Sequence, residues 1–75
     1  MNVHVECYAG HRADEEPRVI EIDGNRLCVL GIAHRWQDMG ARYFQVRAED
    51  CDRYLLRHDE RSDEWSVVEV QRASG

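Results

Sequence analysis

The chain lacks several features that mark common classes of protein. It contains no apolar run of about 18 residues, the length that a membrane-spanning helix needs. Its first residues, from Met1 to Val5, show no basic stretch followed by an apolar segment, so we expect no signal peptide. Its three cysteines, an odd number, are not typical of a secreted disulfide framework. We therefore expect a cytoplasmic protein.

Lysine is absent too, so all ten basic residues are arginines, against 15 acidic residues and a net charge of −5. An all-arginine complement is the result expected from GC-rich codon usage, and we do not interpret it as ten binding groups. Proteins that hold nucleic acid by its phosphates usually carry net positive charge. The balance therefore disfavours nucleic acid as a partner, although it leaves room for a local basic face.

The length of 75 residues indicates a single domain, residues 1–75. A core of this size rarely supplies more than about 3–5 kcal/mol without a disulfide, a metal or a partner chain. A homodimer or a protein partner is therefore an expected source of further stability.

Proline is scarce as well, and its one position marks a boundary. Pro17 ends a polar segment that begins at Ala9, and proline is excluded from central strands. Elsewhere apolar and polar residues alternate with a period of two, which indicates strands. The predicted strands run from Val3 to Tyr8, Arg18 to Ile22, Arg26 to Trp36, Tyr43 to Ala48, Arg53 to His58 and Glu64 to Gln71. Six short strands joined by polar turns predict an all-β fold, either a small curled antiparallel sheet or an SH3-like barrel.

The apolar alternation changes phase within the third predicted strand, between Val29 and Ile32. Gly31 lies at the change, and a glycine there is typical of a β-bulge. A helical alternative exists for the segment from Ile32 to Met39 and for the segment from Cys51 to His58, because apolar residues in both also fit helical spacing. Gly31 and Gly40 bracket the first stretch, so we favour strands.

A series of short motifs runs through most of the chain in a fixed order. They read Pro17, Gly24, Leu27-Cys28-Val29, Ile32, Trp36, Tyr43-Phe44-Gln45-Val46, Asp50-Cys51, Tyr54-Leu55-Leu56, His58-Asp59 and Trp65. This order resembles a family of small bacterial proteins grouped as a domain of unknown function. Leu27 and Cys51 depart from the family pattern, which has an aromatic residue and a turn glycine there. The resemblance implies an all-β fold and a cytoplasmic bacterial protein, and it implies no activity.

Loop lengths predict how the strands pair. A five-residue loop from Gln37 to Ala41 pairs Trp36 with Arg42. The remaining predicted pairs are His34 with Phe44, Ile32 with Val46, Val46 with Tyr54, Phe44 with Leu56 and Arg42 with His58.

This register brings Trp36, Arg42 and His58 together at one end of the sheet, near Trp65. An arginine beside a tryptophan suits an anion or nucleotide, and we predict a ligand-binding corner from these four residues. The alternative is an ordinary edge of the core, in which Arg42 covers Trp36 and meets an acidic residue.

The opposite face of the same hairpin interleaves aromatic and arginine side chains. Tyr43, Arg47, Arg53 and Arg57 lie there with Gln45 and Leu55. Small β folds hold single-stranded nucleic acid on faces of this composition. The alternative is a solvated face whose arginines pair with the acidic residues.

Metal binding and catalysis have weak support in the sequence. Cys7-x3-His11 and Cys28-x5-His34 do not match a standard zinc pair, so we predict neither a metal nor a cofactor. We predict no catalytic residue either, because the hairpin places Cys51 far from His58. Cys51 itself occupies the position of a three-residue turn that usually requires glycine, so we expect it to be exposed with positive φ. The sequence thus favours a non-enzymatic binding or interaction module, and the alternative is a single-stranded nucleic-acid-binding β-barrel.

Overall fold

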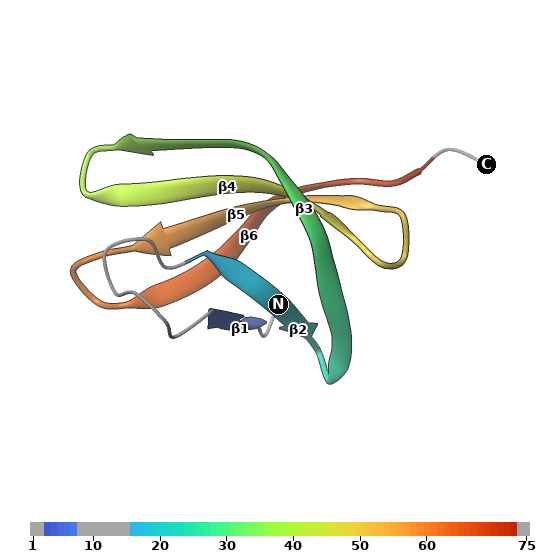
Figure 1. Ribbon diagram of the computed structural model, residues 1–75. Helices are drawn as coiled ribbons and strands as arrows, with labels where there is room; N and C mark the ends of the chain where they lie inside the picture. Colours follow the sequence, from blue (N-terminus) through green and yellow to red (C-terminus); the bar gives the residue numbers. More distant parts are fainter. Residues whose placement is uncertain (1–2, 8–15, 74–75) are drawn as a thin grey trace.

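The computed structural model describes residues 3–7 and 16–73, which form one curled antiparallel sheet (Figure 1). Its strands follow one another in chain order: β1 (Val3–Cys7), β2 (Pro17–Ile22), β3 (Asn25–Asp38), β4 (Ala41–Ala48), β5 (Arg53–Asp59) and β6 (Glu64–Gln71). The described residues contain no helix, and therefore none that could cross a membrane. The predicted all-β fold is confirmed, and the helical alternative is wrong.

Two of the hairpins close with two-residue turns in which both residues have positive φ. These are Asp23-Gly24 (φ 49° and 89°) and Met39-Gly40 (φ 52° and 79°). Such turns match the right-handed twist of the flanking strands, and glycine adopts positive φ without strain. The second turn makes β3 longer than predicted, because the five-residue loop expected from Gln37 to Ala41 is reduced to two residues.

The β4–β5 hairpin has the three-residue loop that the sequence predicts. The backbone N–H of Cys51 donates to the Ala48 carbonyl (2.9 Å), and the N–H of Ala48 donates to the Asp52 carbonyl (3.0 Å). Cys51 is exposed and has a φ of 71°. Both features were expected of a residue in this turn position, and both are confirmed.

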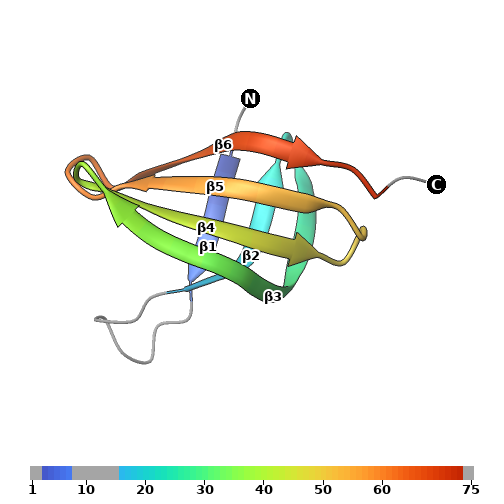
Figure 2. The same cartoon turned by 90° about the horizontal axis from the view of Figure 1, so that it is seen from above.

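β3 passes from one half of the sheet to the other. Its first residues, from Asn25 to Cys28, pair with β2, and the stretch from Val29 to Asp38 pairs with β4. The register shifts twice in this stretch, between Val29 and Gly31 and again just before His34. Figures 1 and 2 show β3 bending as it crosses between the two halves. The predicted bulge near Gly31 is confirmed, and the second bulge was not predicted.

The core lies inside the curl of the sheet. Ile20, Phe44, Val46 and Leu56 are at most 1% exposed, and partly buried apolar residues of β1, β2, β3 and β6 pack around them. We call this side the inner face and the opposite side the outer face. β1 contacts β6, so the two ends of the sheet approach each other around the core.

A third bulge settles the orientation of the last strand. Leu56 pairs with Val67 while Leu55 pairs with Glu69, which leaves Val68 as the extra residue. Trp65, Val67 and Val70 therefore all pack against the core, and Val68 is 53% exposed. Trp65 and Val67 occupy odd positions and Val70 an even one, and they share the inner face because the bulge inverts the alternation.

Candidate ligand-binding surfaces

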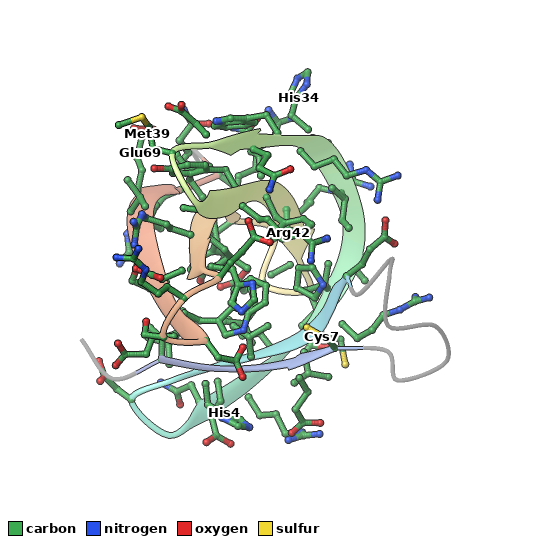
Figure 3. All side chains as sticks on the ribbon, turned by 90° about the vertical axis from the view of Figure 1, so that its left-hand side faces the viewer. His4, Cys7, His34, Met39, Arg42 and Glu69 are labelled. Carbon is green, nitrogen blue, oxygen red and sulfur yellow. The ribbon has the colours of Figure 1, made fainter. Side chains whose placement is uncertain are left out.

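Three of the four residues predicted to form a ligand-binding corner lie together on the inner face. Arg42 pairs with His58 across β4 and β5, as predicted, and His58 pairs with Trp65 across β5 and β6. Directly paired residues share one face of a sheet, so all three side chains point into the curl. Figure 3 shows Arg42 within the ring that the strands form.

The fourth residue, Trp36, lies on the outer face, and its predicted pairing with Arg42 is wrong. Trp36 pairs with Tyr43, the neighbour of Arg42 on β4. Successive residues of a strand point to opposite faces, so Trp36 and Arg42 are separated by the sheet itself. The corner of four residues therefore does not form.

The error arises at the second bulge of β3. Ile32 pairs with Val46, as predicted, so the register is correct up to that point. Ala33 is the extra residue of the bulge, and it shifts every later pair by one position. His34 consequently does not pair with Phe44, as expected, and lies opposite Gln45 instead.

His58 is held from two sides. Its side chain is buried, and its ring stacks on Trp65 with centroids 4.4 Å apart and 20° between the planes. The ring nitrogen Nε2 donates to Asp63 Oδ1 at 2.7 Å. The other nitrogen, Nδ1, has no hydrogen-bond partner among the described residues. Both contacts keep the imidazole in one orientation at the end of the core.

The loop that supplies Asp63 is itself ordered by Asp59. The Asp59 carboxylate accepts backbone N–H groups from Arg61 (3.0 Å) and Ser62 (3.2 Å). These bonds, with Ser62 contributing most, lower the pKa of Asp59 below its ordinary value. The loop is therefore built by a local side-chain-to-backbone motif, which places Asp63 over His58.

Arg42 and Phe44 lie beside His58 and Trp65, and we call these four residues the inner cluster. The Arg42 guanidinium lies 5.1 Å from the centre of the Phe44 ring, and Phe44 contacts Trp65 with centroids 5.7 Å apart. The cluster thus closes one end of the core with stacked flat groups. Its role in binding a ligand stays a prediction.

The residues predicted to form a nucleic-acid face all lie on the outer face. Tyr43 pairs with Arg57, and Arg47 pairs with Arg53, across β4 and β5. Arg57 also lies 3.6 Å from Asp59, so its charge is partly balanced.

Trp36 joins this outer surface, where sequence analysis did not expect it. Its ring stacks on Tyr43 with centroids 5.3 Å apart and 6° between the planes, and Trp36 is 45% exposed. Ala33 carries no local signal of a bulge, so the alternation of residues alone could not place Trp36 on this face.

The opposite end of the curl holds a hollow. A cavity of about 460 Å³ is lined by residues of β2, β3, β5 and β6, with Tyr54 and Asp50 among them. The Tyr54 hydroxyl donates to Asp50 at 2.5 Å. Burial, followed by this bond to a carboxylate, raises the pKa of Tyr54 to about 12.

The cysteines are free and separated. Cys7 is half-buried against the core, while Cys28 and Cys51 are exposed. Within residues 3–7 and 16–73, no three histidine, cysteine or acidic side chains gather as metal ligands. His11, which forms part of one spacing considered above, lies outside the described residues.

Comparison with protein-family models, curated proteins and solved structures found no match. The resemblance to a small bacterial family therefore stays a prediction.

Proposed function

We propose that this chain is a non-enzymatic binding module that engages its partner through the outer face of β3, β4 and β5. The observation that carries the proposal is the stacked pair of Trp36 and Tyr43, which presents aromatic surface to solvent on a sheet face. Exposed tryptophan, tyrosine and arginine are the side chains that contribute most to binding energy at interfaces.

The placement of the reactive residues supports a module without catalysis. Cys51 precedes the start of β5, and His58 lies near its end. A nucleophile needs a base within hydrogen-bonding reach, and this pair is separated by most of a strand.

A second candidate function, binding of single-stranded nucleic acid, is favoured by how the charges are distributed. Along β4 and β5, the ionisable outer-face side chains are Tyr43, Arg47, Arg53 and Arg57, with one acid, Asp59, at the end of β5. Other acids lie around this face, Glu69 on β6 opposite Leu55 and several in and beside the turns at positions 49–52 and 59–64. A face that combines stacking aromatics with arginines suits bases and phosphates, even on a chain with a net charge of −5.

Photo-crosslinking in cells tests the proposal and separates the partner classes. A photoreactive amino acid replaces Tyr43 in one variant and the exposed loop residue Arg61 in a matched control. We expect a crosslinked species from position 43 that is absent from position 61. Equal labelling at the two positions would contradict the proposal.

The nature of the crosslinked species identifies the partner. If nuclease treatment removes the mass that crosslinking added to the chain, the partner is nucleic acid. If protease treatment and not nuclease treatment degrades the added mass, the partner is a protein. A species of twice the chain mass indicates a homodimer. A cytoplasmic location, expected from composition, is tested by fractionating the same cells.

A further inference from the structure

Two arginines face each other on the outer face, and neither has an acidic partner among the described residues. Arg47 on β4 pairs directly with Arg53 on β5, and both are exposed. Neither guanidinium forms an ion pair with another described residue. Like charges directly opposite each other destabilise a sheet. Folding alone therefore does not favour this arrangement.

The arginine pair borders a hollow of about 220 Å³, whose other walls are Gly31, Ile32 and Ala33. This stretch of β3 is where the two register shifts occur. Apart from Gly31 itself and its two chain neighbours, no atom lies within 4 Å of the position that a Cβ on Gly31 would take. At Gly31 the wall of the hollow is therefore backbone without a side chain, and glycine in a bulged strand often marks close approach by a ligand.

The acids of the neighbouring loop only partly balance the two arginines. Asp50 accepts the hydroxyl hydrogen of Tyr54, and Asp52 accepts the backbone N–H of Ala73 at 2.9 Å. Those two carboxylates are therefore engaged in holding the loop and the end of the chain. An anion entering the hollow meets two guanidinium groups that no carboxylate in the described part of the chain occupies.

We propose that this hollow binds a phosphate group, with the guanidinium groups of Arg47 and Arg53 on two sides and the backbone of Gly31 beneath. Guanidinium groups match phosphate oxygens with paired, parallel hydrogen bonds. A planar carboxylate is satisfied by one such fork, whereas the oxygens of a phosphate are arranged tetrahedrally, so two guanidinium groups can bind them from two sides. The paired arginines therefore favour phosphate.

The site goes beyond the proposed function and does not depend on it, because no aromatic residue takes part. Arg47 lies four residues from Tyr43 along β4, or about 13 Å in an extended strand. One single-stranded ligand could therefore place a base on the aromatic pair and a phosphate in the hollow. A free phosphate group could also occupy the hollow alone.

The direct test is titration with inorganic phosphate at constant ionic strength, followed by NMR of the arginine Nε–Hε groups and the Gly31 amide. We expect saturable shifts at Arg47, Arg53 and Gly31, and none at Arg61. Arg47→Gln and Arg53→Gln should each weaken binding about tenfold or more, because each removes a charge-assisted pair of hydrogen bonds. Arg61→Gln, the matched control, should bind as the wild type does.

Gly31→Val provides an independent steric test. Gly31 does not have positive φ and the space above it is open, so the variant should fold and yet fill the hollow. A dispersed amide spectrum establishes folding, and phosphate binding should be lost. The proposal is overturned if chloride causes the same shifts as phosphate, or if Arg61→Gln weakens binding as much as Arg47→Gln does.

A short oligothymidylate and its uncharged methylphosphonate analogue distinguish the sources of phosphate. Shifts at Arg47 with the first and not with the second assign the site to a nucleic-acid backbone. Shifts with inorganic phosphate alone assign it to a small phosphorylated ligand, and the site still stands. Trp36→Ala should leave binding of inorganic phosphate unchanged. The proposal of a phosphate site and the proposal of a binding module on the outer face can therefore be overturned independently of each other.

Discussion

Trp36 and Tyr43 stack across β3 and β4 with 6° between their ring planes, on the side of the sheet away from the core. Because the pair lies outside the core, its contribution to stability can be measured without disturbing the interior. Cross-strand aromatic pairs contribute about 0.5–1.5 kcal/mol beyond the area that they bury.

A double-mutant cycle with Trp36→Ala and Tyr43→Ala should therefore give a coupling free energy of about 0.5–1.5 kcal/mol. The measurement is the free energy of unfolding from denaturant titrations. As a control, Trp36→Ala combined with Leu55→Ala should be additive within about 0.5 kcal/mol, since Leu55 lies two strands away. A coupling energy near zero between Trp36 and Tyr43 would show that the stacked geometry is not maintained in solution.

Cys51→Gly should stabilise the domain by up to about 1 kcal/mol, because glycine tolerates the φ of 71° that strains a side chain. For a domain of this size, that corresponds to a rise in Tm of about 4–8 °C. The measurement is a thermal melt under reducing conditions.

The matched control for this prediction is Cys28→Gly. Cys28 is exposed on β3 and does not have positive φ, so glycine there should destabilise the strand by about 0.5–1 kcal/mol. If both substitutions lower Tm, the explanation from backbone strain at Cys51 is wrong.

Tyr54 should ionise later than an ordinary tyrosine, since its pKa is raised to about 12. Folding favours the neutral phenol, so the folded state holds its proton to higher pH than the unfolded state does. The stability that this provides is fully present below pH 10, the ordinary value, and is lost as pH rises from there through about 12.

Tyrosinate absorbance during an alkaline titration measures this ionisation directly. Tyr54→Phe should remove the latest step, while Tyr43→Phe should leave it in place. Asp50→Asn should move the step to lower pH, because it removes the neighbouring carboxylate that the hydroxyl bonds. A titration of the wild type in which every tyrosine ionises at the ordinary value would contradict the buried position of Tyr54.

His58→Phe should change the free energy of unfolding by no more than about 1 kcal/mol, whereas His58→Ala should cost about 2–4 kcal/mol. Phenylalanine keeps the stack on Trp65 and removes the buried Nδ1 atom, which has no hydrogen-bond partner in the described part of the chain. The partner carboxylate of Asp63 is 85% exposed and can return to water. Equal losses in the two variants, measured in denaturant, would mean that the bond to Asp63 matters more than the stacking.

The sequence by itself was sufficient for those features that depend on neighbouring residues. Alternation with a period of two indicated six strands, because each strand buries one face against a common core. The loop from Glu49 to Cys51 is short enough to admit one turn geometry, so the β4–β5 register and the positive φ of Cys51 followed from it. The pairing of Arg42 with His58 could be predicted for the same reason.

The tertiary structure alone decided which face several side chains occupy. Ala33 and Val68 are the extra residues of bulges, and neither position is marked by a glycine. Bulges accompany the bending of strands around a core, and the curvature of the whole sheet depends on contacts between residues distant in sequence. The single bulge at Ala33 moved Trp36 from the predicted corner to the outer face, because one extra residue inverts the alternation that the sequence displays.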